Sequence, residues 1–311
     1  MPEPEYVWLP KDRLLSFEEL IQVSQIAVGL GVNSIRITGG EPLLRRDLPT
    51  LIRHLSKING LKDLALTTNG VLLAPLARAL KKSGLHRITL SLDSLQPERY
   101  AAFSGIDKLE EALQGLRAVQ EAGFKDIKIN AVAIRGFNDD ELGDMLRFAG
   151  RENVQLRFIE YMDVGGATEW TSQKVLSAKE ILRMLSAQFG AIRPLPGRGS
   201  APSQSYQLEN GQVFGIIGSV SEPFCGDCDR GRVTADGTLY TCLYAEKGVD
   251  LCSIIRGENG LSGLEKALSE AWINRRDRGA VHRTATKNRG AWVSADRLRR
   301  EPRLEMHTRG G

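Results

Sequence analysis

A unit of helix, glycine and short apolar strand recurs along the first half of the chain and constrains its fold more than any other feature. Ser16 and Glu19 form a capping-box pattern for a helix that should end near Leu30, and a strand over 34–38 follows. Further strands are expected at 63–67, 87–92, 126–134 and 154–159, with helices at 48–58, 72–83, 107–122 and 140–150 between them. Strands that alternate with helices pair in parallel, so the pattern predicts an α/β fold, either a doubly wound sheet or part of a barrel.

Polar residues directly follow four of these strands. The four segments are Thr38-Gly39-Gly40-Glu41, Thr67-Thr68-Asn69-Gly70, Ser91-Leu92-Asp93-Ser94 and Glu160-Tyr161-Met162. Parallel α/β folds bind their ligands at the carboxyl ends of the strands. One such segment would be ordinary turn chemistry, but four in succession predict a binding site at this edge of the sheet.

The pattern changes after about residue 165. A helix is expected at 178–189, with Ser177 and Glu180 as its capping box, and another at 261–273. Two hairpins are expected, 206–217 turning at Asn210-Gly211 and 232–241 turning at Asp236-Gly237. We therefore expect two domains, 1–165 with the parallel strands and 166–311 as a smaller α+β domain.

The four cysteines of the chain lie close together in the second half. Cys225 and Cys228 form a C-x2-C pair, Cys242 follows after a hairpin, and Cys252 comes ten residues later. So few cysteines in one region indicate a reducing compartment and a metal site rather than a disulfide scaffold. Three thiolates brought to one point suit zinc or an iron-sulfur cluster, and three ligands would leave one iron of a cubane open. A zinc ribbon with Cys252 as its fourth ligand is the alternative.

Several positively charged residues lie at positions where burying a charge costs free energy. Lys128 and Arg157 interrupt apolar strands, and Arg36 lies near the end of the first strand, so an anionic ligand would explain all three. Arg230 and Arg232 flank Gly231 beside the cysteine pair and would project the same way on an extended chain. Paired guanidinium groups match phosphate geometry, although a solvated pair on a hairpin is the alternative.

The overall charge predicts no polyanionic partner. Lys plus Arg exceeds Asp plus Glu by only 4, too small a surplus to require a nucleic acid or a membrane surface. No run of about 18 apolar residues occurs, and the start is acidic and proline-rich. We expect a cytoplasmic protein.

In combination, the motifs resemble one family, GTP 3′,8-cyclase (molybdenum cofactor biosynthesis protein A), a family of radical S-adenosylmethionine (SAM) enzymes. The matching features are Thr38-Gly39-Gly40-Glu41-Pro42, Thr67-Thr68-Asn69-Gly70, Ser91-Leu92-Asp93-Ser94, Arg157-Phe158-Ile159-Glu160, the three cysteines and the terminal Gly310-Gly311. The resemblance covers almost the whole chain. It implies an incomplete, partial TIM-like parallel βα barrel, covered by a C-terminal domain that carries an iron-sulfur cluster.

The resemblance also implies roles for individual residues. Those implied to contact SAM are Gly40, Glu41, Ser91 and Met162. Those implied to hold GTP are Arg36, Thr67, Lys128, Arg157, Arg230, Gly231 and Arg232. Cys225, Cys228 and Cys242 would bind a [4Fe-4S] cluster whose open iron meets the guanine. The Gly310-Gly311 tail would reach the active site and assist radical formation.

The implied reaction converts GTP to 3′,8-cyclo-7,8-dihydro-GTP in the first step of molybdenum cofactor biosynthesis. A 5′-deoxyadenosyl radical from SAM would take the ribose 3′ hydrogen, and the ribose radical would attack guanine C8. The implied partners are GTP, a second copy of the chain in a homodimer, and functionally the next enzyme, cyclic pyranopterin monophosphate synthase.

The chain departs from the family near its start. Family members carry C-x3-C-x2-C before the Gly-Gly-Glu-Pro loop, which binds a second [4Fe-4S] cluster that reduces SAM, and this sequence has no cysteine before Cys225. We expect either a start recorded too far downstream or a truncated, inactive GTP-binding protein with one cluster. The chain as written is expected not to cleave SAM. A zinc-ribbon protein that binds nucleic acid is a third interpretation.

Overall fold

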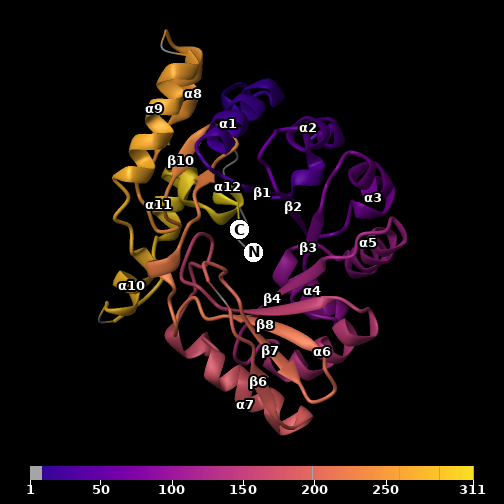
Figure 1. Ribbon diagram of the computed structural model, residues 1–311. Helices are drawn as coiled ribbons and strands as arrows, with labels where there is room; N and C mark the ends of the chain where they lie inside the picture. The colour runs from indigo at the N-terminus through magenta and orange to yellow at the C-terminus, as the bar shows by residue number, and fades with distance from the viewer. Residues whose placement is uncertain (1–8, 198, 259, 287, 311) are drawn as a thin grey trace.

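A computed structural model describes residues 9–197, 199–258, 260–286 and 288–310 (Figure 1). Its main element is an eight-stranded sheet in the order β1-β2-β3-β4-β5-β8-β7-β6. The strands are β1 (Ser34–Ile37), β2 (Asp63–Thr68), β3 (Arg87–Ser91), β4 (Ile127–Ala133), β5 (Gln155–Glu160), β6 (Ile192–Pro194), β7 (Gln204–Leu208) and β8 (Val213–Ile217). Strands β1 to β5 pair in parallel in chain order, which confirms the prediction from the alternating pattern. The sheet curves without closing on itself, so the fold is a partial barrel rather than a flat doubly wound sheet.

Helices cover the outside of the curve, where the first precedes β1 and the others connect the parallel strands. They are α1 (Phe17–Gly29), α2 (Leu48–Leu55), α3 (Leu73–Lys82), α4 (Pro97–Ser104), α5 (Leu109–Glu121) and α6 (Leu142–Arg151). The capping box that the sequence predicts at Ser16 and Glu19 is present. Helix α4 is not predicted by periodicity, because only two turns separate Pro97 at its start from the left-handed Gly105 at its end.

Close packing between α5 and the loop after β2 fixes the position of the Thr67-Thr68-Asn69-Gly70 segment. A Cβ at Gly115 of α5 would lie 2.2 Å from the carbonyl oxygen of Gly70, so only glycine allows this approach. Around this contact the core is apolar, and Leu64, Leu66, Leu73 and Leu90 are fully or almost fully buried in it. The Thr67-Thr68-Asn69-Gly70 segment therefore rests on a rigid base.

The second half of the chain first extends the same sheet. Helix α7 (Ala178–Phe189) begins at the predicted capping box of Ser177 and Glu180. The predicted hairpin forms as β7 and β8, and β8 pairs in parallel with β5, where Arg157 lies opposite Gly215. The sheet thus crosses the boundary predicted at 165/166. Residue periodicity does not show this pairing, because the paired residues are far apart in sequence.

The rest of the chain lies along the open side of the curved sheet (Figure 1). Its strands β9 (Arg232–Val233), β10 (Thr238–Tyr240) and β11 (Val249–Asp250) form a small antiparallel sheet that contains the second predicted hairpin. Its helices are α8 (Leu251–Arg256), α9 (Gly260–Ile273), α10 (Gly279–Thr284), α11 (Ala295–Arg300) and α12 (Met306–Arg309). Helix α9 packs on α1 through an apolar cluster that includes Val23 and Leu264. Within the described ranges, no helix has the length and hydropathy to cross a membrane.

Candidate active site

One polar side chain from each of the five parallel strands belongs to a group on the inner face of the sheet. Thr67, Thr89 and Lys128 are successive partners across β2, β3 and β4, so they lie on one face. Arg36 of β1 joins them, because its Nη1 donates to Thr67 Oγ1 at 2.9 Å and to Thr89 Oγ1 at 3.2 Å. Arg157 of β5 lies opposite Asn130, two residues beyond Lys128 and therefore on the same face.

Burial and neighbouring positive charges lower the pKa values of the three cations in this group. Burial lowers the pKa of Arg157 to about 10, and the charges of Arg36 and Arg87 add to the effect. Burial and the charge of Arg157 likewise lower the pKa of Lys128, whose Nζ is 3.0 Å from Asp126. The Nε of Arg157 is buried and has no hydrogen-bond partner among the described residues. Closely spaced cations with spare donors form a site for a polyanion such as a phosphate chain.

The Gly-Gly-Glu-Pro segment forms the loop after β1, and Glu41 fastens it to the loop after β2. Its carboxylate accepts hydrogen bonds from Thr68 Oγ1 at 2.8 Å, Asn69 N at 2.8 Å and Leu43 N at 2.9 Å. Burial raises the pKa of Glu41 despite these bonds. The carboxylate therefore holds Gly40 in place through contacts within the chain.

The other residues predicted to contact SAM lie at the same edge. Ser91 is the last residue of β3, and Met162 comes two residues after the end of β5. Together with Gly40 after β1, they stand at the carboxyl ends of three parallel strands. The structure thus brings Gly40, Glu41, Ser91 and Met162 to one edge of the barrel, as the sequence predicts.

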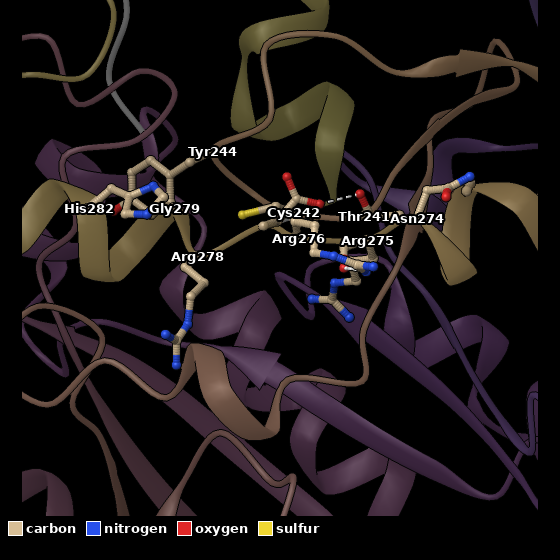
Figure 2. A pocket seen from close by; sticks show the side chains of 11 residues that line it. Thr241, Cys242, Tyr244, Asn274, Arg275, Arg276, Arg278, Gly279 and His282 are labelled. Atoms are coloured by element: carbon tan, nitrogen blue, oxygen red, sulfur yellow. Dashed lines mark hydrogen bonds between the residues drawn. The ribbon is translucent and has the colours of Figure 1, made fainter.

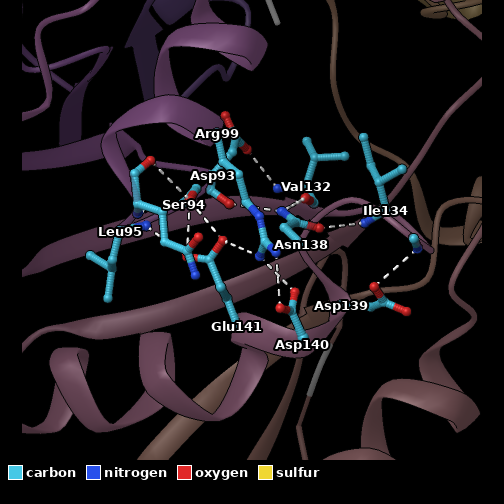
Figure 3. A network of polar contacts seen from close by, with 12 residues as sticks. Asp93, Ser94, Leu95, Arg99, Val132, Ile134, Asn138, Asp139, Asp140 and Glu141 are labelled. Atoms are coloured by element: carbon cyan, nitrogen blue, oxygen red, sulfur yellow. Dashed lines mark hydrogen bonds and ion pairs between the residues drawn. The ribbon is translucent and has the colours of Figure 1, made fainter.

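A buried polar network fixes the loop that follows Ser91 (Figure 3). Val132 N donates to Asp93 Oδ1 at 2.7 Å, and Asn138 Nδ2 donates to the carbonyl oxygens of Asp93 and Val132. Ser94 donates to Glu141, whose carboxylate also pairs with Arg99 at 2.7 Å. This network connects β3, β4 and the start of α6, so the edge of the site is rigid.

Asp93 is expected to make stability depend on pH. Burial raises its pKa from 3.8 to about 6, so the folded protein binds this proton more tightly than the unfolded chain does. The ionised carboxylate therefore costs up to about 3 kcal/mol above pH 6, and this cost disappears as the pH falls through 6 towards 4. We expect Asp93→Asn to stabilise the protein at pH 8 and to have little effect at pH 4.

Urea unfolding at pH 8, 6 and 4 measures this difference, because an asparagine oxygen can still accept the bond from Val132. The exposed Asp107→Asn is the matched control, and its effect should not change over this range. A difference between wild type and Asp93→Asn that is the same at all three pH values would contradict the assignment.

The cysteine pair and its arginines form the second part of the site. Cys225 begins the short 3-10 helix η5 (Cys225–Asp227) and Cys228 follows it. Arg230 Nη2 donates to Cys228 Sγ at 3.3 Å. Burial acts to raise the pKa of Cys228, but its hydrogen bonds with Arg230 and the charge of Arg230 outweigh burial and lower it. Cys228 therefore loses its proton more readily than an ordinary cysteine.

Arg232 lies close enough to Cys228 and Cys242 for their thiols to influence its pKa. Burial and the charge of Arg230 lower the pKa of Arg232 to about 10, whereas the nearby thiols of Cys228 and Cys242 act to raise it. Tyr240 is opposite Arg232 in the β9–β10 pair, so Cys242, two residues further on, lies beside Arg230. The hairpin thus brings Cys242 back towards the cysteine pair.

The three cysteines predicted to hold a cluster lie just before and just after the β9–β10 hairpin. In the described part of the chain, no three Cys, His, Asp or Glu side chains are placed to hold one metal ion. Cys242 instead opens onto a cavity of about 420 Å³ that Arg275 and Arg278 also line (Figure 2). The donor chemistry still fits an iron-sulfur cluster, which is wider than one ion: three free thiols, one of them with a lowered pKa, and cations that balance a thiolate charge.

Cys252 stands apart from the other three cysteines. It lies on α8 in the apolar cluster with Leu239, Leu251 and Leu264, and burial raises its pKa. A Cβ at Gly237 would be 2.9 Å from Cys252 Cβ, which places Cys252 at the turn of the β9–β10 hairpin. The other cysteines flank the opposite, open end of that hairpin, so the described structure does not form the four-cysteine zinc ribbon.

The C-terminal tail reaches the Gly-Gly-Glu-Pro loop. Gly310 has a positive φ of 75°, and a Cβ there would be 2.5 Å from Thr38 Cγ2. Arg309, only 2% exposed, anchors the tail, because its Nη1 donates to Leu243 O at 2.6 Å and its Nε to Arg303 O at 2.7 Å. Its guanidinium also lies 4.1 Å from the centre of the Tyr240 ring. Gly311, the other predicted tail residue, lies outside the described residues.

Sequence reasoning missed four residues of this region. Thr89 and Asn130 share the inner face with Lys128, and the two-residue period of a strand could have found them. Asp163, just after Met162, and the anchor Arg309 carry no local signal, because their partners come from distant segments.

Two family models and several solved structures match the chain. The Radical SAM superfamily model matches residues 4–149, and the Molybdenum Cofactor Synthesis C model matches residues 154–281. Streptococcus suis SuiB bound to S-adenosylmethionine superposes with a TM-score of 0.61 at 16% identity, over 86% of this chain and 60% of that one. Native anSMEcpe with bound AdoMet superposes with a TM-score of 0.53 at 16% identity, over 82% of this chain and 75% of that one. The fold is that of the radical SAM superfamily.

Comparison with curated relatives identifies the family within this superfamily. GTP 3',8-cyclase 3 of Mycobacterium bovis is 48% identical over all of this chain and 83% of its own length. GTP 3',8-cyclase 1 of Mycobacterium tuberculosis is 47% identical over 100% of this chain and 88% of its own length. GTP 3',8-cyclase of Aquifex aeolicus is 44% identical over 100% of this chain and 91% of its own length. The chain belongs to the GTP 3′,8-cyclase family.

Proposed function

We propose that this protein converts GTP to 3′,8-cyclo-7,8-dihydro-GTP, with SAM as the source of the radical, in the first step of molybdenum cofactor biosynthesis. The observation that carries the proposal is the group of Arg36, Lys128 and Arg157 inside the barrel of a chain from this family. Burial lowers the pKa of all three, Arg36 adds to the shift of Arg157, and Arg157 adds to that of Lys128, so an anionic substrate at this position would offset the buried positive charge.

The triphosphate of GTP would bind between the barrel and the C-terminal segment. Arg36, Lys128 and Arg157 would contact it from one side, with Thr67 as a further donor, and Arg230, Gly231 and Arg232 from the other. The spare Nε groups of Arg157 and Arg230, both buried and without partners among the described residues, are suited to such contacts. Charge-assisted bonds to phosphate would orient the ribose towards the edge of the barrel.

SAM would bind at the carboxyl ends of β1, β3 and β5, against Gly40, Ser91 and Met162. Glu41 would help by holding the loop after β1 to the loop after β2. When bound, SAM supplies radical chemistry, and the protein's part is to orient the substrate and contain the radical. The tail would assist from the same place, because Gly310 packs on Thr38.

Cys225, Cys228 and Cys242 would hold a [4Fe-4S] cluster. With only three protein ligands, such a cluster supplies one iron that is open to a substrate atom. Arg230 and Arg275 would balance the negative charge of the Cys228 thiolate, since both lie within hydrogen-bonding reach of this residue. We also propose that the active protein is a homodimer that supplies cyclic pyranopterin monophosphate synthase.

Nucleotide titration tests the substrate assignment directly. We expect the anaerobically purified chain to bind GTP with a micromolar Kd and ATP at least about tenfold more weakly, because the site would recognise the purine as well as the phosphates. Isothermal titration with both nucleotides measures this. Equal affinity for GTP and ATP, or no binding of GTP, would contradict the proposal.

A second candidate function is GTP binding without SAM cleavage. The four cysteines of this sequence lie between residues 225 and 252, and three of them would hold one cluster beside the proposed GTP site. The two functions differ in the release of 5′-deoxyadenosine from SAM under reducing conditions. Release by the protein from its native source supports the cyclase, whereas GTP binding with no release supports the second function.

A further inference from the structure

Asp163 is a buried carboxylate at the edge of the barrel that no part of the proposed reaction uses. It follows Met162 directly, and its side chain is 0% exposed. Tyr244 Oη donates to it at 2.7 Å, Arg283 Nη2 lies 2.6 Å away and Arg289 Nη2 lies 2.8 Å away. These bonds lower the pKa of Asp163 although burial opposes them. All three partners come from the C-terminal segment, so the carboxylate joins the barrel to the part of the chain that covers it.

The contacts continue from Asp163 to the cysteines. Tyr244 lies two residues after Cys242, on the cavity that Cys242 also lines (Figure 2). The hydroxyl of Tyr244 donates to Asp163, so this hydrogen bond joins the Cys242 loop to the end of β5. Asp163 therefore determines how the Cys242 loop sits on the barrel.

The contacts also continue from Asp163 to the tail. Trp292 N donates to Asp163 O at 2.8 Å, and the Trp292 ring packs edge-on against Tyr244 at 5.6 Å. The Arg309 guanidinium lies 5.2 Å from the centre of the same Trp292 ring. Gly310 comes next and rests on Thr38. A continuous series of packed groups thus links Asp163 with the tail.

We propose that Asp163 is a positioning residue that holds both the Cys242 loop and the C-terminal tail against the carboxyl edge of the barrel. Its removal would leave Arg283 and Arg289 without their shared anion, and the covering segment would loosen before the barrel unfolds. The inference rests on the proposed function only in treating Cys242 and Gly310 as site residues.

Native-state proteolysis of the full chain tests this role. Trypsin can remove Gly310-Gly311 only when the buried Arg309 is released, and mass spectrometry detects the product. We expect Asp163→Asn to accelerate this cleavage about tenfold, because local opening governs the rate. Glu141→Gln is the matched control: Glu141 is 3% exposed and also pairs with an arginine, Arg99, but lies wholly within the barrel (Figure 3). It should change tail cleavage less than about twofold.

Tyr244→Phe provides a second variant if Asp163→Asn does not fold. It keeps the ring against Trp292 and removes only the hydroxyl that bonds to Asp163, so we expect tail cleavage to rise about threefold. Equal cleavage rates in wild type, Tyr244→Phe and Asp163→Asn, or an equal rise in Glu141→Gln, would overturn the proposal. Tail cleavage requires no GTP, so a failure of GTP binding in the wild type would refute the proposed function separately.

Discussion

Replacing Arg230 and Arg232 together by alanine is expected to weaken GTP binding at least about hundredfold. Each charge-assisted hydrogen bond to a phosphate contributes about 1.5–3 kcal/mol, and a factor of ten corresponds to 1.4 kcal/mol. The Arg230 guanidinium is held in place before any ligand binds, because it stacks on Phe224 at 4.8 Å and donates to Cys228 Sγ at 3.3 Å. Little conformational entropy would therefore be lost on binding.

The single variants Arg230→Ala and Arg232→Ala, together with the conservative Arg230→Lys, make this test more specific. Arg230→Lys keeps the charge but loses the planar fork, so most of the affinity should be lost as well. Arg193→Ala is the matched control, since Arg193 is exposed on β6 at the far edge of the sheet. Unchanged GTP affinity in both Arg230→Ala and Arg232→Ala, measured by titration, would remove these residues from the site.

Cys242→Ser is expected to abolish iron-sulfur binding by this chain. With three thiol ligands, the loss of one leaves two, and a cubane held by two cysteines is not retained. Cys252→Ser should leave the iron content unchanged, because Cys252 packs in the apolar cluster at the other end of the hairpin. Iron and sulfide analysis of anaerobically purified protein, with its visible absorption, measures both.

The outcomes separate three arrangements of metal ligands. Iron lost in Cys242→Ser and retained in Cys252→Ser supports the three-cysteine cluster. Iron lost in both variants would mean that Cys252 moves towards the other cysteines when the group binds. Zinc in place of iron in the wild type would contradict the cluster and favour a structural metal site.

Local sequence signals predicted most of the secondary structure. The capping boxes at Ser16 and Ser177 and the turns at Asn210-Gly211 and Asp236-Gly237 each depend on residues a few positions apart. For this reason the five parallel strands followed from the alternating pattern, whereas their order in the sheet came from the structure. Helix α4 was missed because two turns are too short to show a period.

The positions of functional residues were only partly predictable. Lys128 and Arg157 stood out because burying a cation has a cost that an anion can offset, and the structure places both on the inner face of the barrel. The spacing of the three cysteines predicted that their segments come together, and the β9–β10 hairpin brings Cys242 back beside Arg230, where it lines a cavity with Arg278. Spacing sets how close two segments can come, whereas the rotation of a side chain depends on everything that packs around it.

The sequence alone therefore determined the order of helices and strands, the edge at which the polar loops gather, and the residue types that can hold an anion or a cluster. These properties follow from interactions within about ten residues and from the cost of burying charge. Only the tertiary structure decided that β8 joins the sheet beside β5, that Gly310 rests on Thr38, and that Asp163 binds Tyr244, Arg283 and Arg289. Such contacts join distant parts of the chain, and their energy depends on close packing that no local pattern records.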